Sequence, residues 1–222
     1  MCTAFSVNTL RKIEPFIKRF KISSFENNHL PMIDEMLKNS KPIIMSTGVT
    51  TFQEIHESLK YIPEANITLL HCVSQYPTPI DKANMSQINF YKKAFPFLKV
   101  GISDHTRHPF LIPVMAVAMN ATIIEKHFTL SNSLPGLDHN FAVTDIELKE
   151  MIAMVRNAEQ AMLICDDSDN PEKNYARRAL QATINIKAGD IFVLGYNFDV
   201  LRPVFKKRGL DALFLNTVNG AK

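Results

Sequence analysis

The feature that most constrains the fold is the alternation of short apolar runs with helical patterns over the first two thirds of the chain. Each run carries Ile, Val or Leu and is separated from the next by residues with helical spacing, which is typical of βα units. We predict strands at 19–23, 42–46, 67–71, 98–102 and 122–127. This order favours an α/β fold with a parallel sheet, of the (β/α)8 TIM-barrel type but incomplete, with about five βα units.

Two predicted helices begin with a capping box, in which a Thr and a Glu three residues later satisfy free backbone N–H groups. The boxes are Thr51-Phe-Gln-Glu54 and Thr144-Asp-Ile-Glu147. We expect the first helix to close at Pro63 and the second to reach about Ile164. The second helix has an apolar stripe that we predict to pack in the core, made of Ile146, Met151, Ile152, Val155, Ala158 and Met162.

The sequence divides into a barrel domain at 1–165, a polar, acidic linker at 166–176, and a small β-rich domain at 177–222. In the last of these we predict strands at 180–186 and 191–193, separated by the turn signal Lys187-Ala-Gly-Asp190.

Composition indicates a soluble globular protein, since 46% of the 222 residues are hydrophobic and 21% are charged. A formal charge of +3 is too weak to favour nucleic acid or a membrane surface as partner, although small anions stay possible. Three cysteines give no disulfide framework. The longest uncharged stretch, 108–124, is too short for a membrane span. No signal peptide is visible, so we expect a cytoplasmic protein.

Two histidines stand in matching settings, each at the end of an apolar run. They lie in Gly101-Ile-Ser-Asp-His-Thr106 and in Glu125-Lys-His-Phe-Thr-Leu130. Polar residues at the carboxyl ends of barrel strands converge on the active face, and imidazole suits first-row divalent metals. The pattern favours a metal site at His105 and His127; the alternative is a pair of hydrogen-bonded, partly buried histidines.

Six collinear motifs carry a resemblance that covers nearly the whole chain. They are Lys21-Ile-Ser-Ser24, Lys41-Pro-Ile-Ile-Met-Ser-Thr-Gly48, Leu70-His-Cys-Val-Ser-Gln-Tyr-Pro-Thr78, the two histidine motifs, and Gly136-Leu-Asp-His139. In this order they resemble the sialic acid synthase family, whose members condense phosphoenolpyruvate with an N-acylated mannosamine-type sugar to make nonulosonic acids. Ile184-Asn-Ile-Lys-Ala-Gly-Asp190 and Leu201-Arg-Pro203 are similar to the family's C-terminal antifreeze-like (SAF) domain.

The resemblance implies that His105 and His127 hold a divalent ion, commonly manganese. It places Glu26, Glu125 and Asp138 as catalytic carboxylates, although Glu125, like Asp104, could instead orient the histidines. It assigns substrate contacts to Thr3, Lys21, Ser24, Ser46, Ser74, Tyr76, Ser103 and Arg202.

In the implied reaction, C3 of phosphoenolpyruvate attacks the polarised sugar aldehyde, water adds at C2, and phosphate departs. Arg202 matches an arginine that the family's second domain delivers into a partner subunit, so a domain-swapped homodimer is implied.

Relative to the family, the N-terminal barrel strands and the end of the SAF domain are absent. One alternative is therefore a catalytically inactive remnant that acts as a binding or assembly module; another is a related metal-dependent aldolase on the same barrel plan. The acceptor is open between N-acetylmannosamine and the sugars that lead to legionaminic or pseudaminic acid. The segment 136–142 looks closer to the sialic and legionaminic branches.

Overall fold

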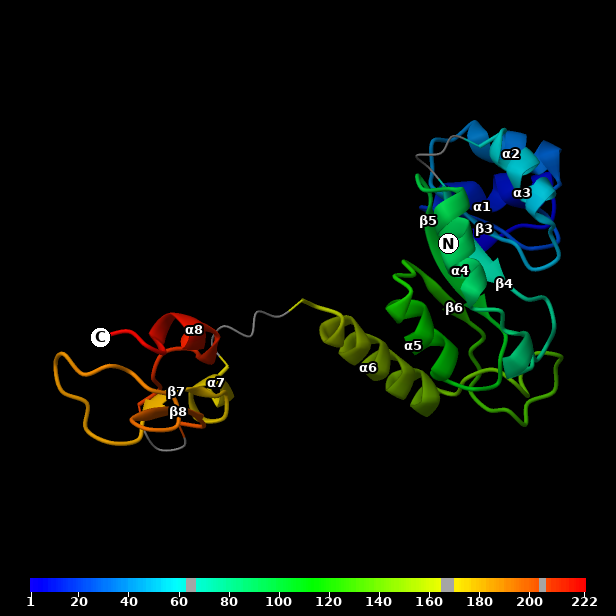
Figure 1. Cartoon of the computed structure of the whole chain (residues 1–222). Coiled ribbons are helices and arrows are strands. Elements are labelled where there is room, and N and C mark those ends of the chain that lie inside the picture. The colour runs from blue at the N-terminus through cyan, green and yellow to red at the C-terminus, as the bar shows by residue number, and fades with distance from the viewer. Residues whose placement is uncertain (63–66, 165–169, 204–206) are drawn as a thin grey trace. The chain divides into compact units, whose positions relative to one another are not determined.

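The computed structural model describes residues 1–62, 67–164, 170–203 and 207–222. The chain divides into two compact units, Met1–Leu163 and Ile164–Lys222, each of which is described by itself (Figure 1). Residues 165–169 of the predicted linker lie outside the described ranges, and so does Pro63, the predicted helix end. Within the described ranges, no helix is both long and apolar enough to cross a membrane.

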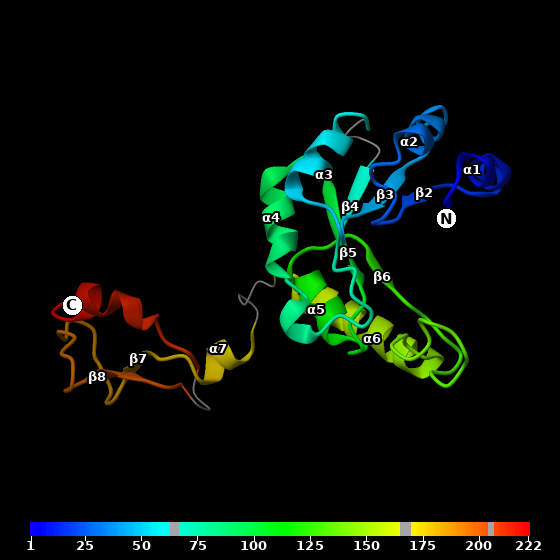
Figure 2. The same cartoon turned by 90° about the vertical axis from the view of Figure 1, so that its right-hand side faces the viewer.

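The first unit is built on a six-stranded sheet in which every strand pairs in parallel with its neighbour in the chain (Figure 2). All five predicted strands are confirmed, but the structure adds one at the N-terminus that is two residues long, too short to show a sequence pattern. Because the strand order never reverses, the sheet winds as in a barrel rather than as in a doubly wound fold. The strands are β1 (Cys2–Thr3), β2 (Phe20–Ile22), β3 (Ile43–Ser46), β4 (Ile67–Cys72), β5 (Lys99–Asp104) and β6 (Ile124–Lys126).

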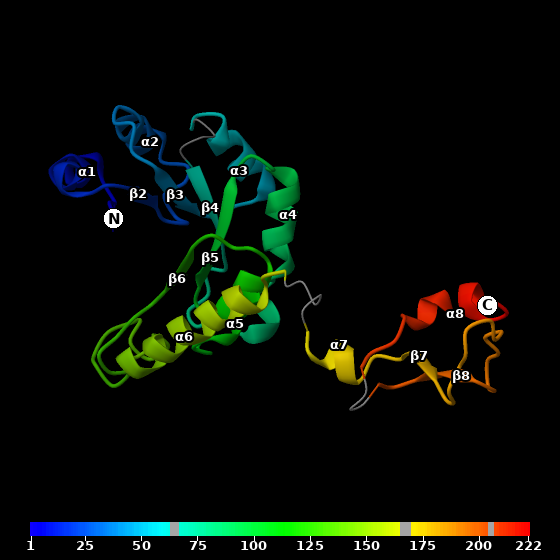
Figure 3. The same ribbon diagram turned by 90° about the vertical axis from the view of Figure 1, so that its left-hand side faces the viewer.

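Helices follow the strands and cover one face of the sheet; α3 and α4, for example, lie on the same side of β4 and β5 (Figure 3). On that face the strands contribute buried apolar residues such as Phe20, Met45 and Leu69, which belong to the core cluster. The helices are α1 (Val7–Ile13), α2 (Leu30–Leu37), α3 (Phe52–Leu59), α4 (Ser86–Ala94), α5 (Leu111–Ala118) and α6 (Asp145–Ala161), with 3-10 turns η1 (Glu14–Phe16) and η3 (Ile80–Lys82).

Because successive strand residues point to opposite faces, the residues between these apolar positions face away from the helices. On β2 and β3 these are Lys21 and Ser46, and on β5 and β6 they are Ser103 and Glu125. The fold thus separates an apolar face, sealed by helices, from a face with polar groups at the strand ends.

Both predicted capping boxes are present, at the starts of α3 and α6. The predicted stripe on α6 is only partly right: Met151 is buried, but Ile146, Ile152 and Met162 are 68%, 49% and 51% exposed. The helix packs mainly on α5. Since α5 contacts one side of α6, the buried line runs through Met151 and the half-buried Val155, while the flanking apolar positions face outward.

The second unit has a two-stranded antiparallel sheet of β7 (Ala179–Ala182) and β8 (Phe198–Leu201), with α7 (Glu172–Tyr175), η5 (Ala212–Phe214) and α8 (Leu215–Val218). The predicted strand at 180–186 ends at Ala182, and the strand predicted at 191–193 is wrong. The physical reason is Asn197, whose side chain accepts a hydrogen bond from the Val193 N–H at 2.8 Å and donates one to the Ile191 carbonyl at 2.9 Å. These backbone groups need no partner strand.

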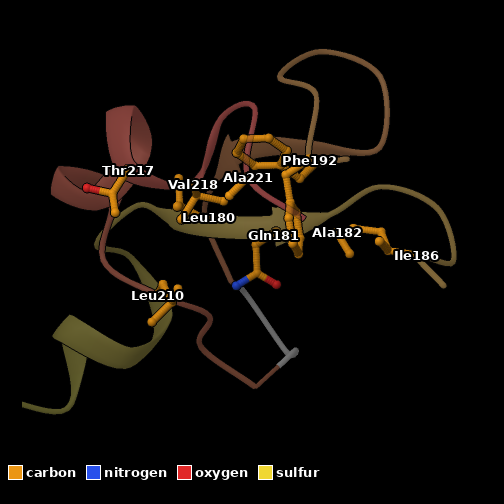
Figure 4. Close-up of a pocket in the computed structure, with 10 residues that line it drawn as sticks. Leu180, Gln181, Ala182, Ile186, Phe192, Leu210, Thr217, Val218 and Ala221 are labelled. Carbon is orange, nitrogen blue, oxygen red and sulfur yellow. The ribbon is translucent and has the colours of Figure 1, made fainter. Parts of the chain in front are cut away.

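An apolar cavity of about 370 Å³ lies in this unit, between β7 and the C-terminal segment (Figure 4). Leu180, Phe192, Leu210 and Val218 line it. The assignment of the unit to the SAF type remains a prediction.

Candidate active site

Nearly all the predicted site residues of the first unit lie on the inner face of the sheet or in the loops that follow its strands. Thr3, Lys21, Ser46, Ser103 and Glu125 belong to strands. The remaining ones follow a strand in the chain, and they are Ser24, Glu26, Ser74, Tyr76, His105, His127 and Asp138. The parallel direction of the strands therefore collects these residues at one edge, as in the active face of a barrel.

A buried lysine forms the centre of the β2–β3 side. Lys21 Nζ donates a hydrogen bond to Ser46 Oγ at 2.8 Å and lies 3.4 Å from Glu125 Oε1. Ser103 Oγ donates to the same Glu125 oxygen at 2.7 Å. The Lys21 side chain is 6% exposed whereas that of Glu125 is 33% exposed. The cluster therefore joins a buried cation and two buried hydroxyls to a partly exposed carboxylate, and a cation with hydroxyl donors can bind an anion.

Next to this cluster, three short polar side chains surround Gly48. The Gly48 N–H donates to Ser24 Oγ at 2.9 Å. A Cβ on Gly48 would collide with the Ser74 hydroxyl and lie 2.9 Å from both Cys72 Sγ and Ser24 Oγ. Only glycine therefore leaves room for these groups here. Burial raises the pKa of the Cys72 thiol, so it stays protonated near neutral pH.

The two predicted metal ligands lie together, with ring centroids 5.2 Å apart. His105 Nδ1 lies 2.8 Å from the Val73 carbonyl, which can only accept, so Nδ1 carries the proton and Nε2 keeps its lone pair. Burial lowers the pKa of His105 and favours the neutral ring. His127 Nδ1 lies 3.5 Å from Asp138 Oδ2. A carboxylate behind an imidazole holds the ring in the same tautomer in many metal sites.

These histidines fit a divalent ion, because His105 keeps its Nε2 lone pair and His127 has a carboxylate beside its Nδ1. In the described part of the chain, no group of three or more His, Cys, Asp and Glu residues is placed to bind a metal. Within these described residues, the candidate ligands are thus the two histidines. The metal site remains a prediction.

Aromatic rings border the histidines. The Tyr76 ring centroid lies 4.3 Å from that of His105, and Phe141 packs at 5.9 Å from Tyr76 and 5.0 Å from His127. Tyr76 is 42% exposed, Phe141 is buried, and burial raises the pKa of the Tyr76 phenol. A half-exposed ring thus borders the two imidazoles.

On the opposite face of the same strands, Asp104 and Lys126 form a sealed ion pair at 2.6 Å. Their side chains are 1% and 3% exposed. Burial lowers the pKa of Lys126, and the Asp104 charge opposes that shift. Asp104, which the sequence left open between catalysis and support of the histidines, thus points away from the site.

Three predicted residues are less closely joined to this cluster. Thr3 lies on β1 and is next to the cluster because it is the register partner of Lys21 on β2. Glu26 pairs instead with His29 at 3.2 Å, at the start of α2. Arg202 is an exposed residue of the second unit, after β8. Its delivery into a partner subunit stays a prediction.

Sequence reasoning missed three residues near the site: Cys72, Phe141 and Lys126. Cys72 is the last residue of β4 and Lys126 the last residue of β6. The alternation of side chains along a strand could have predicted that Cys72 faces the site and that Lys126 faces the helices. Phe141 lies in a loop, where no periodicity indicates burial.

Comparison with known proteins gives the family of the first unit. A family model described as NeuB family matches residues 1–164. The chain belongs to the NeuB family. The resemblance inferred from the six motifs is therefore confirmed.

Relatives include the spore coat polysaccharide biosynthesis protein SpsE of Bacillus subtilis, 36% identical over 96% of the chain and 62% of SpsE. The N,N'-diacetyllegionaminic acid synthase of Campylobacter jejuni is 39% identical over 89% of the chain and 60% of the synthase. Among solved structures, an N-acetylneuraminic acid synthetase of Leptospira borgpetersenii matches with a TM-score of 0.70 and 26% identity, over 77% of the chain and 60% of that protein. The chain thus spans less than two thirds of the length of these relatives.

Proposed function

We propose that this chain carries the substrate face of a nonulosonic acid synthase, an enzyme that condenses phosphoenolpyruvate with N-acetylmannosamine or a related acylated amino sugar and releases phosphate. The observation that carries the proposal is the cluster of Lys21, Ser46, Ser103 and Glu125, on the same sheet face as the histidine pair. Membership of the NeuB family and relatives named as synthases support it, and they do not favour an inactive binding module.

Phosphoenolpyruvate carries a phosphate and a carboxylate, so its site needs positive charge and hydroxyl donors. Lys21 would neutralise part of this charge, and Ser46 and Ser103 would donate hydrogen bonds to the oxygens. Ser24 and Ser74 around Gly48 would extend the donor set. The contact between Lys21 and Glu125 is weak, at 3.4 Å. Lys21 would give up this contact for a direct ion pair with the bound anion.

The amino sugar would occupy the side bordered by Tyr76 and Asp138. The Tyr76 ring would stack on it, and the exposed Asp138 carboxylate would accept hydrogen bonds from its hydroxyls. A divalent ion held by His105 and His127, manganese in our proposal, would supply Lewis-acid polarisation of the sugar aldehyde. Holding both substrates in one orientation is the contribution of the remaining residues. A cytoplasmic homodimer in which a partner subunit adds Arg202 is part of the proposal.

The test is phosphate release from phosphoenolpyruvate with N-acetylmannosamine and Mn²⁺, using the 222-residue chain and its His105→Ala variant. The diacetamido sugars that lead to legionaminic acid serve as second acceptors. We expect release that depends on the acceptor and is lost in the variant. Equilibrium binding of phosphoenolpyruvate is measured in parallel. A folded chain that neither binds phosphoenolpyruvate nor releases phosphate with any of these sugars would disprove the proposal.

A further inference from the structure

The Asp104–Lys126 pair occupies the last paired position of β5 and β6. The register of these strands pairs Ile102 with Ile124, Ser103 with Glu125, and finally Asp104 with Lys126. The two predicted metal ligands, His105 and His127, are the first residues after β5 and β6. His105 and His127 thus stand just beyond the strand pairing, where backbone hydrogen bonds between β5 and β6 no longer fix their spacing.

The ion pair also holds the backbone on the far side of His105. Asp104 Oδ1 accepts a hydrogen bond from the Thr106 N–H at 2.8 Å, and Lys126 Nζ donates one to the Thr106 carbonyl at 2.7 Å. The His105 carbonyl itself accepts a hydrogen bond from the Thr78 N–H at 2.9 Å. The two charges therefore bind the residues before and after the histidine to each other and to β6.

Neither charge can act on a substrate directly. Both side chains are almost fully buried, and the alternation along the strands puts them on the helix side, away from Ser103, Glu125 and the histidines. Sheet stability alone does not require such a pair, since hydrophobic residues of similar size often serve as well or better than a buried ion pair.

We propose that the Asp104–Lys126 ion pair positions the metal ligands: it fixes the spacing of His105 and His127 and thereby sets the affinity for a divalent ion. The inference rests on the proposed metal site. It assigns both residues a positioning role, exerted through the backbone.

The test compares Mn²⁺ binding by the parent chain with that of the double variant Asp104→Asn/Lys126→Met, measured from free Mn²⁺ by electron paramagnetic resonance. The double variant leaves no buried charge unpaired, and the amide keeps an acceptor for the Thr106 N–H. The control, Arg11→Gln/Glu35→Gln, removes an ion pair of similar N···O distance, 2.8 Å, that joins α1 to α2 and is more exposed. We expect the Kd for Mn²⁺ to rise about 10- to 100-fold in the double variant, the range found when groups behind metal ligands are removed, and to stay unchanged in the control.

Thermal unfolding of each protein separates positioning from folding. A double variant that unfolds at the parent's temperature and binds Mn²⁺ more weakly supports the inference; one that binds as tightly as the parent overturns it. If the double variant does not fold, the Asp104→Glu variant is used instead, because it keeps both charges but adds one methylene group between the backbone and the carboxylate. Weaker Mn²⁺ binding by this variant supports the inference, and unchanged binding overturns it. A folded parent that binds no Mn²⁺ instead removes the proposed metal site, and the inference with it.

Discussion

Two buried lysines of the same sheet, Lys21 and Lys126, have side chains that are 6% and 3% exposed, yet they face opposite sides, and their carboxylate partners differ in exposure. Lys126 lies under the helices, 2.6 Å from a carboxylate that is itself sealed. Lys21 lies on the inner face, 3.4 Å from a carboxylate that is 33% exposed. Burial of a charge therefore does not reveal its task. The difference is that Lys126 has a short contact with a sealed carboxylate, whereas Lys21 has a longer contact with a carboxylate that solvent reaches.

The largest effect is expected from breaking the sealed pair on one side only. Asp104→Asn leaves the Lys126 charge buried without a counter-charge, and we expect the free energy of unfolding to fall by about 3–5 kcal/mol. Urea denaturation at neutral pH measures it. Glu125→Gln is the control on the other lysine and should cost about 1 kcal/mol or less, because the lost 3.4 Å contact is partly solvated and Lys21 keeps its hydrogen bond to Ser46. Equal losses in the two variants would contradict the comparison.

The second effect is on binding. Lys21→Met removes the cation of the proposed anion site, and loss of a charge-assisted hydrogen bond of about 1.5–3 kcal/mol should weaken phosphoenolpyruvate binding roughly 10- to 100-fold. Stability should change little, since a buried charge is replaced by an apolar chain. Calorimetric titration measures the affinity. The exposed Lys12 of α1 provides the matched control, and Lys12→Met should bind like the parent; a similar loss in both would mean that only net charge matters.

These two contrasts show how far the sequence alone could lead. Strand positions followed from short apolar runs, and the starts of α3 and α6 from the Thr-x-x-Glu spacing of a capping box. The site residues Lys21, Ser46 and Ser103 were assigned by the family resemblance, and their roles stay a prediction. The sequence did not predict that Asp104 and Glu125 face opposite sides of the sheet. Both lie close to a histidine in the sequence, and only the alternation and register of β5 and β6 decide which face each side chain is on. The prediction buried too many residues of α6. Helical spacing indicates which apolar residues share a face, but not how much of that face the neighbouring helix α5 covers. At 191–193 a strand pattern was real, yet the Asn197 side chain competed for the backbone.

A smaller effect sharpens the interpretation of the inner pair. Glu125→Gln keeps an acceptor for the Ser103 hydroxyl but removes the negative charge that competes for Lys21. We expect phosphoenolpyruvate to bind a few-fold more tightly, in line with about 0.5–1 kcal/mol for a partly solvated charge. The same titration detects it. Weaker binding would show that the carboxylate itself contacts the ligand.

The smallest effect concerns an exposed pair, which completes the series. Arg11, through hydrogen bonding, lowers the pKa of Glu35 from its ordinary 4.5 to about 2. Because the folded pKa is depressed, the stability that Glu35 adds is present above pH 4.5 and is lost as the pH falls toward 2. NMR titration of the Glu35 carboxyl should show this pKa, and Arg11→Ala should raise it; a titration near 4.5 in the parent would mean that the pair does not persist in solution.

The unbroken strand order of the sheet bears on how the chain folds during its synthesis. Each strand pairs only with its predecessor and successor in the chain, so no pairing has to wait for a strand from a distant part of the sequence. A nascent chain leaving the ribosome could add β2, β3 and β4 to the sheet one at a time, with each helix sealing the outer face before the next strand is synthesised. The polar inner face would be completed last, because the contact between Lys21 and Glu125 can form only after β6 has been synthesised, four strands after β2.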